Sequence, residues 1–159
     1  MRIIGIDPGT GILGFGVIDT LPGGKAKLID AGVIRTPAHQ ADELRLETIY
    51  DELSGVIKQT KPEAMSVEKL FFARNVTTAM SVAQARGVVL LAGRQAGLDI
   101  FEYTPLQIKQ AITGYGQADK HQVQQMVKTI LGLKAVPKPD DCADAIAAAL
   151  IHAQTVTSG

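Results

Sequence analysis

Four acidic residues in this chain of 159 residues occupy positions where their carboxylates could act together. Asp7 ends an apolar run that begins at residue 2, and Glu68 ends a second apolar run over residues 64–68. Asp141 and Asp144 stand three residues apart at the start of a late helical pattern. A carboxylate at the end of a buried strand is costly unless something compensates its charge, and a hard divalent cation does this through oxygen ligands. The pattern therefore predicts a two-metal site of the kind that hydrolyses phosphodiesters.

Each acid has a simpler explanation when it is taken alone. Asp7 precedes a Pro-Gly-Thr-Gly turn, and such turns occur at phosphate sites but also in ordinary tight hairpins. Glu68 could be a strand-end charge that reaches solvent. Asp141 and Asp144 could favour the dipole at the start of a helix. The combination of two strand ends with one helix start favours a shared site over these separate explanations.

Three aspartates, Asp140, Asp141 and Asp144, stand at the start of the last helix. They leave the third acidic position of the site ambiguous. Asp140 is the residue best suited to cap this helix, which leaves Asp141 and Asp144 on one helical face. Either Asp140 or Asp141 could nevertheless supply the third acidic position of the site.

Other catalytic chemistries find little support in the sequence. No Ser-His-Asp order or phosphate-binding P-loop is present, and the histidines lack the spacing of a zinc site (His39, His121 and His152). The single Cys142 excludes an intramolecular disulfide, which is typical of a reducing compartment. We find no signal-peptide layout and expect no apolar run long enough for a membrane span. The expectation is a cytoplasmic protein without a membrane partner.

Charge is unevenly distributed although the formal net charge is zero. Residues 54–138 carry eleven basic residues against five acidic ones, whereas residues 36–53 carry one base and five acids. A basic surface beside an acidic, metal-loaded pocket suits a polyphosphate substrate such as a nucleic acid. Chance grouping on a solvated surface explains the charges equally well.

The alternation of extended and helical patterns predicts one α/β domain over residues 1–153. A glycine-rich turn at 21–24 and the spacing of apolar residues indicate a three-stranded antiparallel opening, followed by alternating helices and strands. The expected strands are 2–7, 14–19, 25–35, 64–68 and 99–103, and the expected helices are 41–58, 75–96, one from 104, 119–131 and one from about 140. Residues 154–159 are expected to form a disordered tail.

Taken together, these residues resemble those of the RuvC family of Holliday-junction resolvases over residues 1–153. The matching stretches are Ile4–Thr10, Val67–Phe71, Ala73–Asn75, Gln84–Gly87, Phe101–Tyr103, Ile108–Gln110 and Asp141–Ala145. Each stretch alone is unspecific, but their order and combination are highly specific.

The resemblance implies a ribonuclease-H-like fold, with a five-stranded mixed sheet, three antiparallel opening strands and helices on both faces. It implies a homodimer that makes paired, symmetric cuts in four-way DNA junctions during recombination and repair, leaving 5′-phosphate and 3′-hydroxyl ends. Two Mg²⁺ or Mn²⁺ ions per active site and partnership with the RuvA–RuvB branch-migration complex are also implied. The metal-binding catalytic acids would be Asp7, Glu68, Asp141 and Asp144.

The resemblance also implies a set of DNA-binding residues. Phe71 matches an aromatic that stacks on a junction base, and Arg74 matches a DNA-contacting position, with the polar Asn75 beside it. Lys109 and Lys120 match basic residues near the scissile phosphate. Without the resemblance, a Phe at this position would be read as core and the two lysines as solvated helix residues.

Two alternatives remain open at this stage. An actin-like ATPase or sugar kinase shares the strand-end Asp and glycine turn, although it needs a second lobe. A non-catalytic DNA-binding subunit could keep the fold, although retention of all four acids argues against it. Two symmetric cuts require two sites related by a two-fold axis, and the Ala- and Gly-rich helix at 75–96, with Gly87 and Gly93, is the expected dimer interface.

Overall fold

The structure is a computed structural model, and it describes residues 1–69 and 76–159. Its strands are β1 (Arg2–Asp7), β2 (Ile12–Leu21), β3 (Lys25–Arg35), β4 (Ala64–Glu68) and β5 (Asp99–Tyr103). Its helices are α1 (Asp42–Thr60), α2 (Val76–Gln95), α3 (Pro105–Thr113), α4 (Lys120–Leu131) and α5 (Asp140–Thr157). This order of elements is the one that the sequence predicts.

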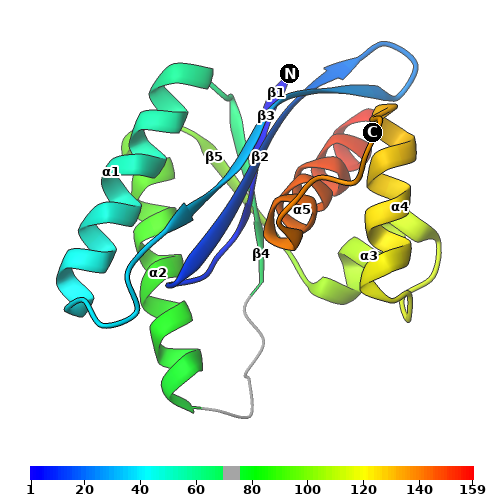
Figure 1. The fold of residues 1–159 in the computed structure, drawn as a ribbon. Helices are drawn as coiled ribbons and strands as arrows, with labels where there is room; N and C mark the ends of the chain where they lie inside the picture. Colours follow the sequence, from blue (N-terminus) through cyan, green and yellow to red (C-terminus); the bar gives the residue numbers. More distant parts are fainter. Residues whose placement is uncertain (70–75) are drawn as a thin grey trace.

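The strands form a single mixed sheet in the order β3-β2-β1-β4-β5 (Figure 1). The pairs β1–β2 and β2–β3 are antiparallel, whereas β4 runs parallel to β1 and β5 runs parallel to β4. The predicted sheet with three antiparallel opening strands is therefore confirmed. Because β1, β4 and β5 share a direction, their last residues, Asp7, Glu68 and Tyr103, lie at one edge of the sheet.

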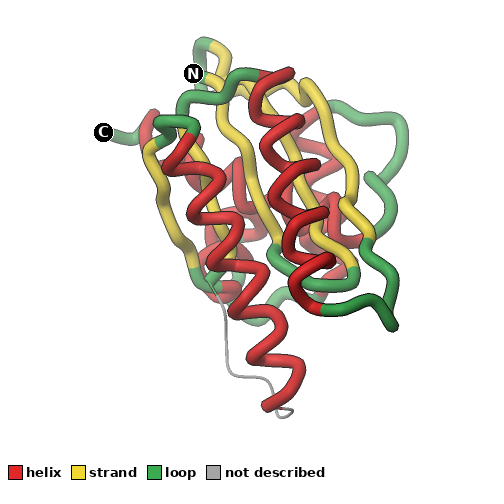
Figure 2. Tube along the Cα trace, turned by 90° about the vertical axis from the view of Figure 1, so that its left-hand side faces the viewer, coloured by secondary structure: helices red, strands yellow, loops and turns green. Residues whose placement is uncertain are grey.

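Helices cover both faces of the sheet, as expected. α1 and α2 lie on one face, and α5 lies on the other with α3 and α4 outside it (Figures 1 and 2). The side chains of β1 divide between these layers because successive residues of a strand point to opposite faces. Ile4 and Ile6 join the core under α1 and α2, whereas Ile3 joins the core under α5.

Glycines on the first two strands let α5 lie directly on the sheet. A Cβ atom at Gly5 would come within 2.0 Å of the carbonyl oxygen of Ala145, and one at Gly14 within 2.1 Å of the carbonyl oxygen of Asp141. Any side chain at these two positions would push the helix backbone away. The close approach brings the first turn of α5 next to the end of β1.

The two ends of α5 differ from the sequence-based expectation. Pro139, not Asp140, occupies the N-cap position, and no side chain caps the helix there. The predicted disordered tail is helical as far as Thr157. Thr155 and Thr157 each donate a hydroxyl hydrogen bond to the carbonyl oxygen four residues earlier, at 2.9 Å. No glycine or proline occurs between Asp140 and Ser158 to stop the helix.

The composition of α2 corrects the expectation that no segment could cross a membrane. By length and hydropathy alone the helix is long and apolar enough to do so. Yet Arg86 on α2 forms an ion pair with Glu102 on β5, and buried residues of the helix pack beside α1 and the sheet. Gly93 serves this packing, since a Cβ atom there would lie 2.9 Å from the sulfur of Met65. These contacts are those of a core helix with one apolar outer face.

Candidate active site

Asp7 and Glu68 come together because they end two neighbouring parallel strands. Ile6 is opposite Val67 in the β1–β4 register, so each acid follows directly at the same edge of the sheet. Both side chains are half-buried, and they share a hydrogen bond. Two carboxyl groups can share such a bond only when one of them holds a proton.

The electrostatics of this pair identify Asp7 as the centre of the acidic cluster. Burial raises the pKa of Asp7 to about 9, with further contributions from Glu68, Asp144 and Asp141. Burial also raises the pKa of Glu68 above its usual value. All three of the other acids predicted for the site lie near enough to Asp7 to raise its pKa, so the four belong to one region of the molecule.

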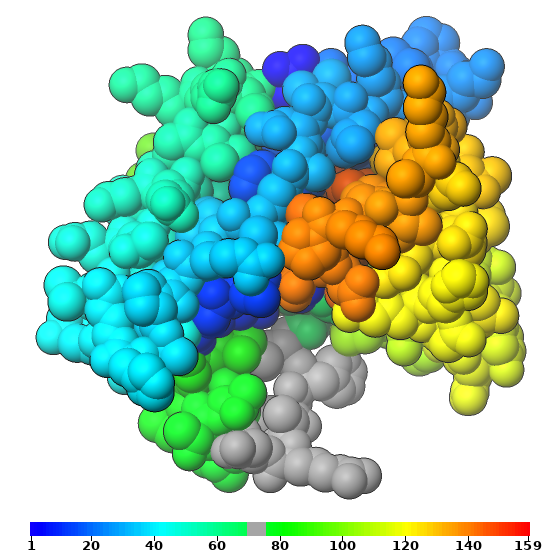
Figure 3. Space-filling model, in the orientation of Figure 1, coloured from blue at the N-terminus to red at the C-terminus, as the bar shows by residue number. Residues whose placement is uncertain are grey.

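Asp141 and Asp144 enter the site from the first turns of α5. Figure 3 shows the start of this helix, in orange, against the blue opening hairpin. Burial raises the pKa of Asp144, and Lys120 on α4 opposes this shift. The Lys120 ammonium nitrogen lies 3.3 Å from an oxygen of Asp144 and 3.6 Å from an oxygen of the exposed Asp140. Asp141 contributes to the raised pKa of Asp7, whereas Asp140 is exposed beside Lys120.

A small cavity of about 200 Å³ opens beside the acids. Glu68 and Asp144 form its acidic wall, and Lys109 on α3 and Lys120 on α4 form a basic wall. Thr104 positions α3 by a capping box, and Asp119 does the same for α4. The cavity therefore joins carboxylates with two ammonium groups held on well-capped helices, a combination suited to a phosphate and a cation together.

The carboxylates of the site are the oxygen ligands that a divalent cation prefers, but they do not surround a single point. Among residues 1–69 and 76–159, no three His, Cys, Asp or Glu side chains are close enough to one another to hold a metal ion. Asp7 instead shares a hydrogen bond with Glu68, which requires a proton, and Asp144 pairs with Lys120. A cation supplies the compensation that the proton and the ammonium group supply in its place.

Three predicted DNA-binding residues, Phe71, Arg74 and Asn75, lie outside the described residues. The structure shows the other two, Lys109 and Lys120, at the cavity. It also shows contacts that sequence reasoning missed. Tyr103 at the end of β5 hydrogen-bonds Nδ1 of the buried His152 at 2.8 Å, and this histidine stacks on Phe101 with ring centroids 4.0 Å apart. The Phe101–Tyr103 stretch of the resemblance was the signal that could have indicated them.

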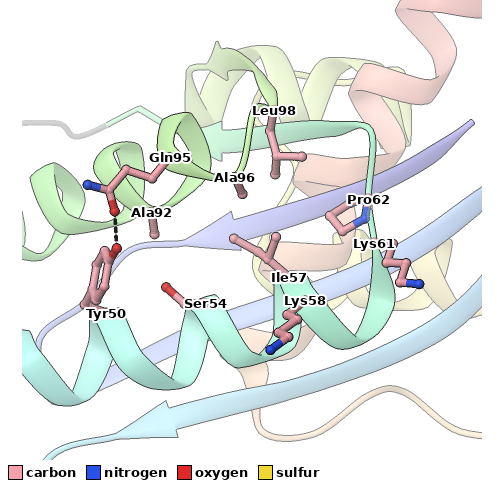
Figure 4. Close-up of a pocket in the computed structure, with 10 residues that line it drawn as sticks. All are labelled: Tyr50, Ser54, Ile57, Lys58, Lys61, Pro62, Ala92, Gln95, Ala96 and Leu98. Carbon is pink, nitrogen blue, oxygen red and sulfur yellow. Dashed lines mark hydrogen bonds between the residues drawn. The ribbon is translucent and has the colours of Figure 1, made fainter.

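A larger cavity lies away from these acids. It occupies about 610 Å³ between α1 and α2, where Tyr50 donates a hydrogen bond to Gln95 across one end (Figure 4). Pro62 and Leu98, which precede β4 and β5, also line it, so it lies at the opposite edge of the sheet from Asp7 and Glu68. The described residues that line this cavity include no acid.

Comparison with known proteins places the chain among junction nucleases. The family model described as crossover junction endodeoxyribonuclease RuvC matches residues 3–152. A protein of that name from Desulfitobacterium hafniense is 55% identical over 156 residues, which cover 98% of this chain and 94% of the relative. Another, from Heliobacterium modesticaldum, is 52% identical over 159 residues, which cover 100% of this chain and 98% of the relative.

Solved structures show the same similarity. RuvC of T. thermophilus in complex with a Holliday junction substrate aligns with a TM-score of 0.95 and 40% identity, covering 100% of this chain and 96% of that one. The yeast mitochondrial Holliday junction resolvase Ydc2 aligns with a TM-score of 0.65 at 14% identity, covering 96% of this chain and 78% of its own. At that identity the second match supports the fold alone, and it agrees with the predicted ribonuclease-H-like architecture.

Proposed function

The chain belongs to the RuvC family of crossover junction endodeoxyribonucleases, and on this premise we propose which of its residues perform the reaction. It is an endonuclease that resolves Holliday junctions in DNA recombination and repair. The comparisons support neither alternative, an ATPase or kinase lobe or a non-catalytic DNA-binding subunit, because relatives of matching length are named as nucleases.

Nucleases of this family depend on metal ions, and the proposed cofactor is a pair of Mg²⁺ or Mn²⁺ ions. Their ligands would be the carboxylates of Asp7, Glu68, Asp141 and Asp144. When bound, such ions would supply charge stabilisation at the scissile phosphate and an activated water for in-line attack, with 5′-phosphate and 3′-hydroxyl ends as the products. Asp7 would be the central ligand, because it ends β1 directly beside Glu68 at the end of β4.

The two lysines that line the cavity are the proposed contacts to the DNA phosphate. Lys109 and Lys120 line the same cavity as Glu68 and Asp144, where an ammonium group can hold a phosphate oxygen next to the acids. Phe71, Arg74 and Asn75 follow Glu68 closely in sequence, and the resemblance supports roles for them in stacking on a junction base and contacting the strand.

A homodimer and its location complete the proposal. The outer face of α2 exposes Val76, Met80, Gly87 and Leu91 at helical spacing, which gives an apolar stripe for a second copy. Two copies would supply the two sites that symmetric cuts require. Sedimentation at micromolar concentration tests this, and a monomer would contradict it. The proposed setting is the cytoplasm, in partnership with the RuvA–RuvB branch-migration complex.

The position of Asp7 and Glu68 at the ends of two paired parallel strands is the observation that carries the proposed site, and one substitution tests it. Asp7→Asn keeps the shape of the side chain but removes the charge that a cation needs. We expect it to bind a synthetic four-way junction like the wild type and to cut it at least about 100-fold more slowly with Mg²⁺ or Mn²⁺. Asp51→Asn, on the exposed face of α1, is the matched control. Plain duplex and a chelator complete the assay, and cleavage by Asp7→Asn at the wild-type rate would disprove the assignment.

A further inference from the structure

A pair of hydroxyl groups connects the turn after Asp7 to α2. Thr10, three residues beyond Asp7, is buried, and its Oγ1 lies 2.5 Å from Oγ of Ser81 in the second turn of α2. Seventy-one positions separate the two residues in sequence. The hydrogen bond is therefore a tertiary contact between the acid-bearing turn and a helix of the neighbouring layer.

Thr36, just beyond β3, and Arg45 of α1 also support this turn. The Thr36 hydroxyl, just beyond β3, donates to the carbonyl oxygen of Thr10 at 2.5 Å, and the Thr36 amide donates to the carbonyl oxygen of Gly11 at 3.0 Å. Arg45 on α1 in turn donates from Nε to the Thr36 hydroxyl at 3.0 Å. Thr10 is thus held by Ser81 of α2 on its side chain and by Thr36 on its backbone, and Arg45 of α1 supports Thr36.

Asp7 is the last residue of β1, opposite Gly14 of β2, and the turn that leads to Thr10 begins directly after it. The next residue, Pro8, has no amide hydrogen to bond. Gly9 follows in a turn so tight that a Cβ atom there would lie 2.2 Å from the carbonyl oxygen of Ile12. Thr10 is therefore the first residue after Asp7 whose side chain and carbonyl are both anchored outside the hairpin.

We infer that Thr10 and Ser81 are positioning residues for the nuclease reaction, whose hydrogen bond holds the Asp7 carboxylate in register with Glu68 and the start of α5. The inference rests on the proposed function of Asp7. It also gives α2 a second role. Met80, next to Ser81, is exposed on the proposed dimer face, so one turn of helix would carry both the partner contact and the support of the acid site.

The test separates positioning from ordinary structural support. Thr10→Val and Ser81→Ala each remove one hydroxyl, and Thr10→Ser keeps it. Single-turnover cleavage of a saturated junction should slow by about 10-fold in the first two variants, because small displacements of a catalytic group are costly. Junction affinity, measured without a divalent metal, should change less than about twofold, and Thr10→Ser should cut within about twofold of wild type. Thr48→Val is the matched control, since its hydroxyl bonds only within α1.

The double variant Thr10→Val/Ser81→Ala makes the outcome decisive. If the two hydroxyls act through one bond, the double variant should be no slower than the slower single variant. Wild-type rates in both single variants, a slowing in Thr10→Ser as large as in Thr10→Val, or multiplied losses in the double variant would overturn the inference. Asp7→Asn, assayed in parallel, tells the two failures apart. If it is inactive while Thr10→Val and Ser81→Ala cut normally, only the positioning role fails, whereas an active Asp7→Asn means that the proposed site itself fails.

Discussion

Lys120 on α4 places its ammonium nitrogen 3.3 Å from a carboxylate oxygen of Asp144 on α5. The contact connects the basic wall of the cavity to its acidic wall. Burial raises the pKa of Asp144, and the ammonium group opposes that shift. The same residue lines the cavity, so Lys120 lies between the proposed metal ligands and the proposed phosphate site.

Replacing Lys120 should therefore impair cleavage more than binding. Lys120→Met keeps much of the side-chain stem but removes the charge, and we expect single-turnover cleavage to fall on the order of 100-fold, as when one charge-stabilising donor is lost. Lys120→Arg should retain more activity than Lys120→Met. The exposed Lys134, beyond α4, supplies the control Lys134→Met. Cleavage by Lys120→Met at the wild-type rate would remove this residue from the site.

Cation binding should release a proton from the metal-free protein. Burial raises the pKa of Asp7 to about 9, so near pH 7.5 its carboxyl group is protonated and must ionise to bind a cation. Isothermal titration with Mn²⁺ in buffers of different ionisation enthalpy should show about one proton released per chain, and the affinity should rise with pH toward 9. Asp7→Asn should lose this release. Binding that releases no proton between pH 7 and 8 would contradict the protonated state of Asp7.

Acid should destabilise the fold through His152. Burial lowers the pKa of this histidine, so the folded chain takes up its proton less readily than the unfolded chain does. The contribution of His152 to the free energy of unfolding is therefore fully present above the ordinary histidine pKa of about 6.5. It falls as the pH drops below that value, by at most about 1.4 kcal/mol per pH unit. Urea unfolding at pH 7.5 and 5.5 should show a smaller loss in His152→Gln than in the wild type, while His39→Gln, at an exposed site, should match the wild type. Equal losses in all three proteins would exclude His152 as the cause.

Packing of α5 on the sheet should tolerate no side chain at Gly14. A Cβ atom there would lie 2.1 Å from the carbonyl oxygen of Asp141, so Gly14→Ala must push the start of α5 outward. We expect a loss of roughly 1–3 kcal/mol in the free energy of unfolding, together with weaker cleavage. Gly55→Ala in α1 meets nothing within 4 Å and should instead be neutral or stabilise by up to about 1 kcal/mol. Equal stability of the two variants would contradict the close approach of α5.

The positions of the four acids in the fold can be predicted from local patterns in the sequence. Apolar runs mark where β1 and β4 end, which places Asp7 and Glu68 at strand ends. The start of a helical pattern places Asp141 and Asp144 on one face. That these ends meet follows from parallel pairing, which the order of elements already favours.

The contacts that tune the site could not be predicted in this way. The Lys120–Asp144 ion pair depends on how α4 packs against α5, and the Thr10–Ser81 bond joins residues from different layers. Neither leaves a periodic signal, since each partner alone looks like an ordinary surface lysine or turn threonine. The end of α5 is hard to predict for a related reason. Polar composition alone does not reveal that Thr155 and Thr157 bond back into the helix.

The most direct measurement is a crystal structure of the protein grown with Mn²⁺, with the metal located by its anomalous scattering. We predict two manganese peaks enclosed by the carboxylates of Asp7, Glu68, Asp141 and Asp144, and the loss of both peaks in Asp7→Asn. Peaks that lie elsewhere, or acids that remain paired with one another and with Lys120 at saturating Mn²⁺, would contradict it.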